Sequence, residues 1–207
     1  MSYSSQIYDT RQAGEIAAFS RLVYDRRLVS AAGGNASARC GDGFLITAGG
    51  DSLRDVREDT LILCDLEGRV LEAPPDRKPS KETPFHAAVY RSRPEVNCMI
   101  HGHPVYSTIA SSLCQTLPLW TDSARLKLRE VPVIAQAPPG SSQLAEYVEE
   151  AVSRTYPRAV AYLLADHGIL TLGETMQDCF DTAELLEDTA QIAVFRQLLA
   201  TGRPLVC

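Results

Sequence analysis

Three of the four histidines of this 207-residue chain lie in two short motifs, His101-Gly102-His103 and Asp166-His167-Gly168, that could bind one metal ion. In an extended strand the side chains of residues i and i+2 point to the same face, so His101 and His103 can both turn an imidazole nitrogen towards one ion. Three neutral imidazoles that leave one coordination position open are typical of catalytic zinc, and imidazole also suits manganese, iron or cobalt. The pattern therefore predicts a divalent-metal site, and a metal site decides the class of chemistry.

Two apolar segments are expected to bring these histidines to one place. Residues 97–100 form a short, largely apolar run that leads into His101 and is followed by a proline, which is typical of a buried strand ending at a loop. A second apolar run, residues 159–165, ends just before His167, and a further run follows at residues 169–172. We therefore expect the first two histidines at the C-terminal end of a strand and the third at a bend between two strands.

The fourth histidine, His86, has a less clear role. It lies on the helix expected at residues 85–91. It could be a core histidine with satisfied hydrogen bonds, a group that orients a metal ligand, or a helix residue near a catalytic acid. Of these we favour the structural role.

The composition indicates one folded domain and argues against nucleic acid or a membrane as a partner. With 207 residues and 45% hydrophobic side chains the chain can bury one core, and we expect a single domain over residues 1–207. The formal net charge of −6, without a run of lysine or arginine, argues against nucleic acid as a partner. No apolar run is long enough to span a bilayer, so we expect no membrane association.

The cysteines indicate a reduced, cytoplasmic protein. They are scattered, with no Cys-x-x-Cys pair, and no basic N-terminal stretch is followed by an apolar one. Most lie among apolar residues and are expected to be small core side chains rather than nucleophiles. The six are Cys40, Cys64, Cys98, Cys114, Cys179 and Cys207.

The order of the expected elements indicates an α/β fold, because strands in the middle with helices on both sides are typical of a layered α/β domain. The helix that follows the proline-rich connector is expected to begin with Ser80 or Thr83 as N-cap and to end before Pro94. The other expected elements are helices at residues 11–28, 104–111, 142–155 and 176–199, a glycine-rich loop at 31–39, and strands at 44–47, 61–64, 69–71 and 131–135.

Four short motifs, taken in their order and spacing, resemble those of the class II aldolase/adducin family, whose enzymes include L-fuculose-1-phosphate aldolase and L-ribulose-5-phosphate 4-epimerase. The motifs are residues 34–39 (Gly-Asn-Ala-Ser-Ala-Arg), 79–82 (Pro-Ser-Lys-Glu), 101–104 (His-Gly-His-Pro) and 166–168 (Asp-His-Gly). The resemblance covers nearly the whole chain. It implies a three-layer α/β/α sandwich with a central, mainly antiparallel sheet, and a homotetramer with active sites at subunit interfaces. It also implies zinc, or another divalent metal such as manganese or cobalt, bound by His101, His103 and His167.

The same resemblance implies roles for the residues around the metal. Glu82 takes the place of the family's acid/base carboxylate, which in the aldolases also approaches the metal when no substrate is present. A divalent ion would stabilise the enediolate that forms as a carbon–carbon bond breaks, while the carboxylate moves the proton. On the residues alone, Glu82 could equally be a first-turn glutamate that complements the helix dipole.

Glycine loops and a helix N-terminus can bind phosphate through backbone N–H groups without a basic surface, although such glycines also serve ordinary turns. The resemblance implies that a phosphorylated sugar or sugar acid is bound here. The phosphate-binding positions become Gly34, Asn35, Gly49, Gly50, Ser80 and Lys81.

Three departures from the aldolase pattern bear on the substrate. Lys81 stands where the aldolases often carry a second serine, and it could strengthen phosphate binding or recognise a carboxylate. The pair Gly49-Gly50 replaces a threonine-glycine pair and loses a hydroxyl contact. Our alignment places Gln136 where the aldolases and epimerases carry a tyrosine acid, so either another group such as Tyr106 or a water donates that proton, or the reaction does not need that acid.

We therefore expect a zinc-dependent lyase that cleaves a ketose 1-phosphate into dihydroxyacetone phosphate and a short aldehyde by a retro-aldol reaction. The main alternative is decarboxylation of a 3-oxo acid phosphate of the 3-oxo-tetronate 4-phosphate type, because residues 79–82 also resemble the decarboxylase branch. A pentulose-phosphate 4-epimerase is less favoured, since the family's epimerases resemble an aspartate at the position of Glu82. A non-catalytic module like the adducin head domain is disfavoured, because such domains tend to lose the metal histidines and the carboxylate.

Overall fold

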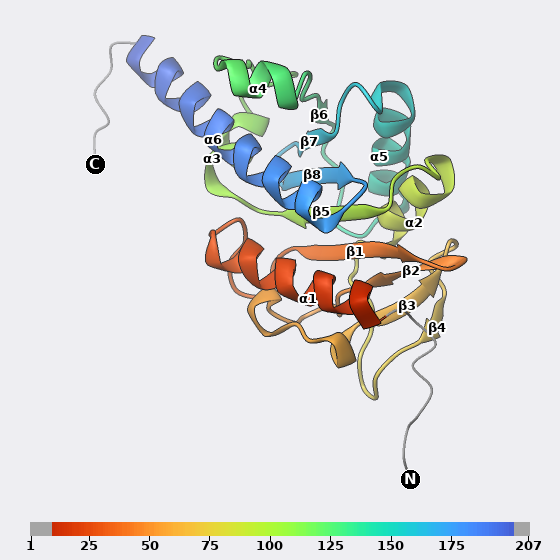
Figure 1. Cartoon of the computed structure of the whole chain (residues 1–207). Helices are drawn as coiled ribbons and strands as arrows, with labels where there is room; N and C mark the ends of the chain where they lie inside the picture. The colour runs from red at the N-terminus through yellow and green to blue at the C-terminus, as the bar shows by residue number, and fades with distance from the viewer. Residues whose placement is uncertain (1–9, 201–207) are drawn as a thin grey trace.

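A computed structural model describes residues 10–200 of the chain, and its central feature is one eight-stranded sheet (Figure 1). The strand order is β4-β3-β2-β1-β5-β8-β7-β6. All neighbouring strands are antiparallel except β6 and β7, which are parallel. The mainly antiparallel sheet that we expected is therefore confirmed. The strands are β1 (Asn35–Cys40), β2 (Gly43–Ile46), β3 (Ile62–Asp65), β4 (Val70–Glu72), β5 (Cys98–Gly102), β6 (Val133–Ile134), β7 (Ala161–Leu164) and β8 (Gly168–Gly173).

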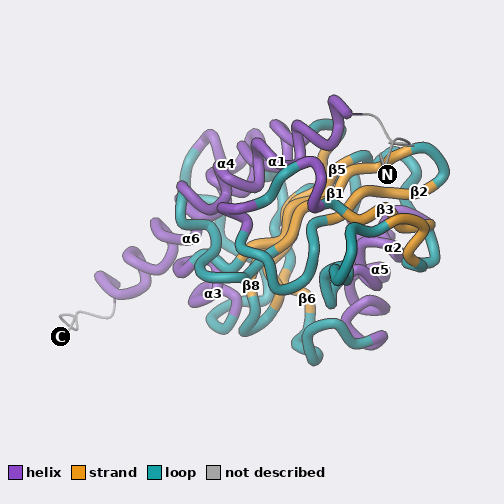
Figure 2. The backbone as a smooth tube through the Cα atoms, turned by 90° about the horizontal axis from the view of Figure 1, so that it is seen from below, coloured by secondary structure: helices purple, strands orange, loops and turns teal. Residues whose placement is uncertain are grey.

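Helices cover both faces of the sheet and complete the three layers (Figure 2). One face carries α1 (Thr10–Asp25), α3 (Val105–Ser111), α4 (Asp122–Lys127) and α6 (Met176–Ala200). The other carries α2 (Thr83–Ser92) and α5 (Ser142–Thr155). Two short 3-10 helices, η1 (Leu53–Asp55) and η2 (Glu58–Thr60), lie between β2 and β3. The α/β/α arrangement is the predicted one, while α4 and the 3-10 helices were not predicted.

The alternation of side chains along the strands produces two separate cores. In β5, Ile100 packs in the core under α1, α3 and α6, while its neighbour Met99 points into the core under α2 and α5. In β8, Ile169 and Leu170 divide in the same way. Because a central strand is covered on both faces, it appears in the sequence as a continuous apolar run, and each fully buried side chain of this kind contributes about 1.5–3 kcal/mol.

The prediction of a loop at residues 31–39 was wrong over most of its length, because β1 begins at Asn35. Small alanine and serine side chains favour strands only weakly, so the sequence pattern did not indicate one. In the structure β1 is hydrogen-bonded on both sides, to β2 and to β5. Ala36 and Ala38 face α1, which packs closely over them. Tertiary pairing thus overrides local preference here.

The described cysteines are core or half-buried side chains, as expected. Burial raises the pKa of the Cys64 thiol to about 11 and that of Cys98 to about 12, which makes both poor nucleophiles. Cys207 lies outside the described residues. Within residues 10–200, no helix combines the length and the apolar character needed to cross a bilayer.

Substitution of Gly168 by alanine tests the close packing of the strands that carry the histidines. A Cβ atom at Gly168 would lie 2.1 Å from the carbonyl oxygen of Gly102 and 2.8 Å from Cδ2 of His103. Because backbone must move to relieve this contact, we expect Gly168→Ala to lower the free energy of unfolding by about 1–3 kcal/mol in urea titrations. The control is Gly14→Ala in α1, where the Cβ meets only the flexible Glu58 side chain, and where we expect a change within about 1 kcal/mol. Equal stabilities of the two variants would contradict this account.

Candidate active site

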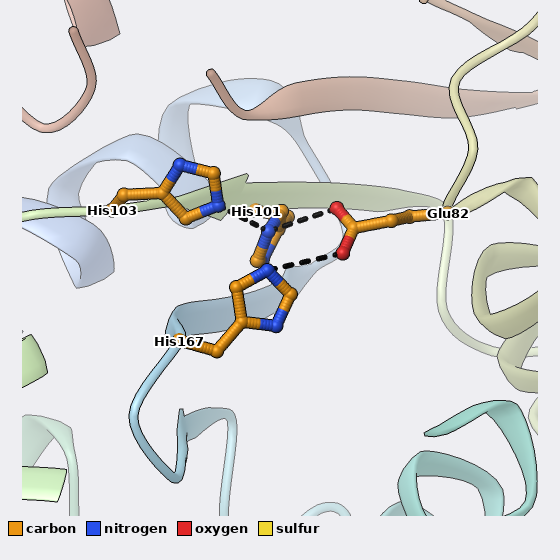
Figure 3. A group of neighbouring side chains, drawn as sticks. All are labelled: Glu82, His101, His103 and His167. Atoms are coloured by element: carbon orange, nitrogen blue, oxygen red, sulfur yellow. Dashed lines mark hydrogen bonds and ion pairs between the residues drawn. The ribbon is translucent and has the colours of Figure 1, made fainter. Parts of the chain in front are cut away.

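The three predicted metal-binding histidines converge where the end of β5 meets the turn between β7 and β8, in the middle of the sheet (Figure 3). His101 is the penultimate residue of β5, and His103 follows directly after that strand. His167 occupies the three-residue turn between β7 and β8, as predicted. Since β5 pairs with β8, with Gly102 opposite Ile169, the strand end and the turn lie side by side.

Glu82 completes the group from a different part of the fold. It is the N-cap residue of α2, so the predictions of Ser80 or Thr83 at this position were wrong. Its side chain makes no capping bond, because it turns instead towards the histidines. Glu82 Oε2 lies 2.9 Å from His101 Nε2, and Oε1 lies 3.2 Å from His167 Nε2.

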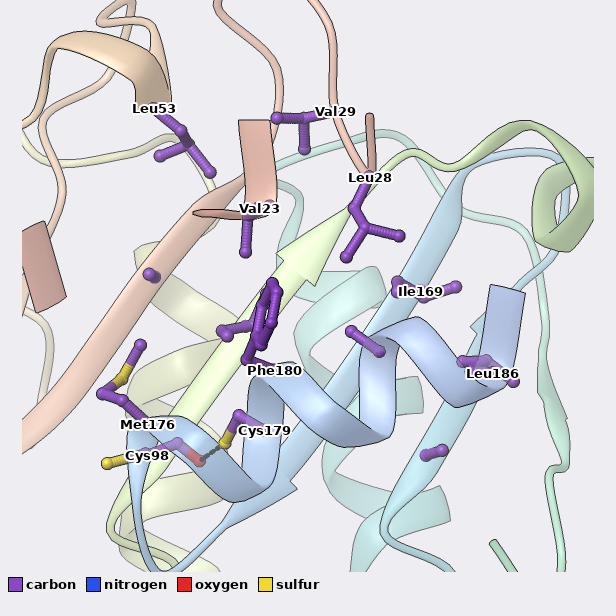
Figure 4. Close-up of a cluster of buried hydrophobic side chains, with 14 of the residues drawn as sticks. Val23, Leu28, Val29, Leu53, Cys98, Ile169, Met176, Cys179, Phe180 and Leu186 are labelled. Carbon is purple, nitrogen blue, oxygen red and sulfur yellow. Dashed lines mark hydrogen bonds between the residues drawn. The ribbon is translucent and has the colours of Figure 1, made fainter. Parts of the chain in front are cut away.

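Two residues of the core under α1 and α6, Leu28 and Ile169, contact the histidines through their backbone carbonyl groups; both are labelled in Figure 4. The backbone N–H of His103 donates to the carbonyl of Leu28 (2.8 Å), and the carbonyl of Ile169 lies 2.7 Å from His101 Nδ1. Both of these partners belong to that core. Gly34 fits against the same backbone with a positive φ of 76°, and a Cβ there would lie 2.7 Å from the His101 carbonyl oxygen.

The donor set fits a divalent cation. The Ile169 carbonyl can only accept, so Nδ1 of His101 carries a hydrogen and the neutral ring has its lone pair on Nε2. That lone pair faces Glu82 Oε2 at 2.9 Å and His103 Nε2 at 2.9 Å. One ligand atom from each of the four residues lies within 4.8 Å of every other. Acceptors gathered in this way are satisfied by a cation between them, and three imidazoles with one carboxylate form a tetrahedral set that zinc accepts.

Burial and neighbouring groups shift the pKa values of these residues in different directions. Burial lowers the pKa of His103 to about 4, lowers that of His167, and lowers that of His86 to about 3. Burial alone would raise the pKa of the Glu82 carboxyl, but charge and a hydrogen bond from His101, with further support from His167 and Asn35, lower it to about 2. Burial thus favours neutral rings at His103 and His167, while the neighbouring histidines and Asn35 favour the carboxylate form of Glu82, as metal binding requires.

A cavity of about 710 Å³ opens in front of the histidines. Every residue predicted for the metal, the phosphate or catalysis lines it, except His101, which is fully buried behind the others. The segment that carries Ser80 runs along the end of β2, because the N–H of Ser80 donates to Thr47 and that of Gly49 donates to Lys78. The Gly49 N–H is therefore already used within the fold.

Ser80 and two lysines provide the polar groups of the cavity wall. Ser80 Oγ accepts hydrogen bonds from Asn35 Nδ2 (3.0 Å) and from the N–H of Glu82 (3.3 Å), which leaves its own hydrogen to donate to a ligand. Lys78 and Lys81 line the cavity, and both are exposed. They give the wall a positive charge in a chain whose net charge is −6.

The two expected proton-donor positions lie elsewhere. Gln136 is exposed and is not among the residues that line the cavity, where its segment contributes Pro139 instead. The ring of Tyr106 packs against Phe195 of α6, with 5.7 Å between ring centroids. Within the described residues, Glu82 is thus the acid/base group closest to the histidines.

The hydrogen bonds behind Glu82 were not predicted, although Asn35 was expected to bind phosphate and His86 was considered as a core histidine or as a helix residue near the catalytic acid. Asn35 Nδ2 donates to Glu82 Oε2 at 2.9 Å, and Asn35 Oδ1 lies 2.6 Å from His86 Nε2. His86 Nδ1 lies 2.7 Å from Ser37 Oγ, which lies 2.8 Å from Tyr90 Oη. The one available signal was the spacing of Glu82 and His86, which places them one helical turn apart.

Comparison with known proteins agrees with this geometry. Residues 14–194 match the family described as Class II Aldolase and Adducin N-terminal domain. The chain belongs to the class II aldolase/adducin family. The expected family and fold class are therefore confirmed, and class II aldolases are generally dependent on a divalent metal.

Relatives within the class II aldolase/adducin family carry different reaction names. The chain is 33% identical to an L-fuculose phosphate aldolase of Methanococcus maripaludis over 172 residues, covering 83% of this chain and 90% of the relative. It is 32% identical to a 3-oxo-tetronate 4-phosphate decarboxylase of Haemophilus influenzae, covering 89% and 87%. It is 33% identical to a methylthioribulose-1-phosphate dehydratase of Methylococcus capsulatus, covering 87% and 91%.

The fold of this class II aldolase/adducin member is also that of a solved aldolase. The crystal structure of L-fuculose-1-phosphate aldolase from Thermus thermophilus superposes with a TM-score of 0.83 at 26% identity, covering 96% of this chain and 100% of the other. The similarity thus extends over the sheet and both helical layers.

Metal content tests the histidine cluster of this class II aldolase/adducin chain. We expect protein purified without chelator to hold about one divalent ion per chain by inductively coupled plasma mass spectrometry, and His101→Ala to lose it. Lys81→Ala is the control and should retain the ion, because Lys81 lies on the cavity wall and outside the cluster. Equal metal content in both variants would contradict the assignment of His101.

Stability against pH tests the neutral histidines. In the unfolded chain a histidine takes up a proton near pH 6.5, whereas the pKa values of His103 and His86 in the fold are about 4 and about 3. Below about pH 6.5 the unfolded state therefore binds more protons, and the stability of the metal-free protein should fall by up to about 1.4 kcal/mol per pH unit for each histidine.

Urea unfolding with chelator, from about pH 7 to about pH 5, measures this slope. The matched variant His103→Gln removes one of the two groups and should show a shallower dependence on pH. An identical slope in the variant, or a stability that does not change with pH, would show that these rings are not buried neutral groups.

Proposed function

We propose that the chain is a divalent-metal-dependent lyase that cleaves a ketose 1-phosphate by a retro-aldol reaction into dihydroxyacetone phosphate and a short aldehyde. The observation that carries the proposal is the placement of the Glu82 carboxylate beside three imidazoles at the floor of a cavity with a cationic wall. The chain is similar to L-fuculose phosphate aldolases over most of its length, which supports the same choice.

In this proposal Glu82 moves the proton. Its low pKa keeps it a carboxylate, so it accepts the proton of the substrate hydroxyl while the adjacent carbon–carbon bond breaks and that carbon becomes the aldehyde. The electron pair passes to the carbon next to the ketone, and Glu82 then returns a proton there. A divalent metal held by His101, His103 and His167 would supply a Lewis acid that polarises the substrate oxygens.

The cavity wall is suited to the phosphate end of such a substrate. The free hydrogen of Ser80 and the ammonium groups of Lys78 and Lys81 are donors for phosphate oxygens. Because the Gly49 N–H is already bonded to Lys78, we assign the phosphate contacts to these side chains together with the remaining backbone of the glycine loops.

Decarboxylation of a 3-oxo acid phosphate is the second candidate. It is favoured by Lys81, a cation on the cavity wall that could recognise a carboxylate, and by similarity to 3-oxo-tetronate 4-phosphate decarboxylases. Both reactions break a carbon–carbon bond next to a ketone, so the same floor of the cavity serves either one.

The homotetramer with shared active sites stays a prediction from the family resemblance. Exposed apolar side chains on α4 and near the end of α6 support contact with a second copy of the chain. These include Leu126, which is 73% exposed, and Leu199, which is 80% exposed.

Product analysis with purified, metal-loaded protein tests the proposal. We expect dihydroxyacetone phosphate from at least one member of a panel of ketose 1-phosphates, and we expect Glu82→Gln to lower kcat at least about 100-fold because it cannot take the proton. Lys81→Met is the companion variant and should raise KM more than it lowers kcat. Release of carbon dioxide from 3-oxo acid phosphates, or loss of water from the sugar phosphates, without any aldehyde product would overturn the retro-aldol assignment.

A further inference from the structure

We propose that His86 is a positioning residue for Glu82, acting through Asn35 to hold the carboxylate in place and aimed at the histidine cluster. This inference rests on the proposed acid/base role of Glu82. It assigns a function in the reaction to a buried histidine that contacts neither the cavity nor the metal-binding atoms.

A continuous chain of short hydrogen bonds links Tyr90 to Glu82. It runs from Tyr90 to Ser37 (2.8 Å), from Ser37 to His86 (2.7 Å), from His86 to Asn35 (2.6 Å) and from Asn35 to Glu82 (2.9 Å). All five side chains are buried. Two elements supply them, since β1 provides Ser37 and Asn35 while α2 and its N-cap provide the others.

The chemistry of each group determines which partner donates and which accepts in every hydrogen bond of this series. A carboxylate only accepts, so the amide nitrogen of Asn35 faces Glu82 and its oxygen faces His86. His86 must therefore donate from Nε2, which leaves Nδ1 as an acceptor for the Ser37 hydroxyl. Ser37 in turn accepts from the Tyr90 hydroxyl. The tautomer of His86 and the orientation of the Asn35 amide are thus set together.

The tautomer of His86 matters because the opposite tautomer would reverse the orientation of the Asn35 side-chain amide. If Nε2 lacked its hydrogen, the Asn35 amide would turn its nitrogen to His86 and its carbonyl oxygen to the Glu82 carboxylate. Two acceptors would then face each other in a buried place, and the carboxylate would move away from His101 and His167. An amide cannot transfer a proton without changing its own bonding. The series of hydrogen bonds from Tyr90 to Glu82 therefore orients side chains and does not conduct protons.

A pair of conservative variants separates positioning from packing. His86→Gln keeps an N–H near the position of Nε2 and can still donate to Asn35, whereas His86→Asn keeps a polar group near Nδ1 and loses that donor. We expect kcat to fall about 10- to 100-fold in His86→Asn with KM nearly unchanged, and to stay within about threefold of the parent in His86→Gln. Metal content should be unchanged in both variants.

Thr171→Val is the matched control for loss of a buried hydrogen bond. Thr171 is fully buried and donates to the carbonyl of Cys179 (3.0 Å), on the α6 side of the sheet and outside the cavity. We expect it to lower the melting temperature without changing kcat. If kcat falls equally in His86→Gln and His86→Asn, and in proportion to the loss of melting temperature, His86 contributes only to packing. That result would overturn the proposal.

Nitrogen NMR of the ring decides the same question without an assay. In protein labelled with ¹⁵N-histidine, the signals absent from His86→Gln identify His86, and we expect a hydrogen on Nε2 and none on Nδ1. A hydrogen on Nδ1 would overturn the positioning role. If the parent protein cleaves no sugar phosphate, the proposed function fails, yet this measurement still shows whether His86 orients Asn35.

Discussion

The structure depends on one electrostatic constraint, the close approach of a carboxylate and three imidazole nitrogens at the largely buried floor of the cavity. Glu82 is 6% exposed and His101 is fully buried. Groups of this kind repel one another unless hydrogen bonds and a cation compensate them. The fold supplies the hydrogen bonds through the Ile169 carbonyl and the Asn35 amide, and it leaves the inner faces of the rings directed at a common point. This arrangement could hold a divalent cation.

The sheet provides the rigidity that such a group requires. β5 lies between β1 and β8, so His101 is held by backbone pairing on both sides, opposite Asn35 and Leu170. Glycines at Gly34 and Gly168 let the neighbouring backbones approach more closely than any side chain would allow. Glu82 comes from the start of α2, in the helical layer, so the sheet does not determine the position of its carboxylate. Its orientation therefore needs the buried polar chain that ends at Tyr90.

Much of the site could be predicted from the sequence because the relevant signals are local. The i, i+2 spacing of His101 and His103, and the apolar runs around His167, express strand geometry directly. The start of β1 at Asn35 could not be predicted, since its alanines and serine are held by pairing with strands distant in sequence. The N-cap position of Glu82 could not be predicted either, because its side chain contacts the histidines and makes no capping hydrogen bond.

The sequence allowed His86 to lie near the catalytic acid, but for the same reason it could not identify the hydrogen-bond partners of this residue. Its partners Asn35 and Ser37 stand about fifty residues away and meet it only through the packing of α2 on the sheet. Relatives of similar identity are named aldolase, decarboxylase and dehydratase, so overall sequence similarity does not distinguish these reactions. The histidine cluster and Glu82 form the floor of the cavity, and Lys81 is one of the residues on its wall that could distinguish these substrates.

X-ray absorption spectroscopy of the metal-loaded protein tests the central claim most directly. The account predicts about three imidazole nitrogens and one carboxylate oxygen around the ion, at roughly 2.0–2.2 Å, with the oxygen contribution altered in Glu82→Gln. A shell of sulfur ligands, or a spectrum without imidazole scattering, would contradict it.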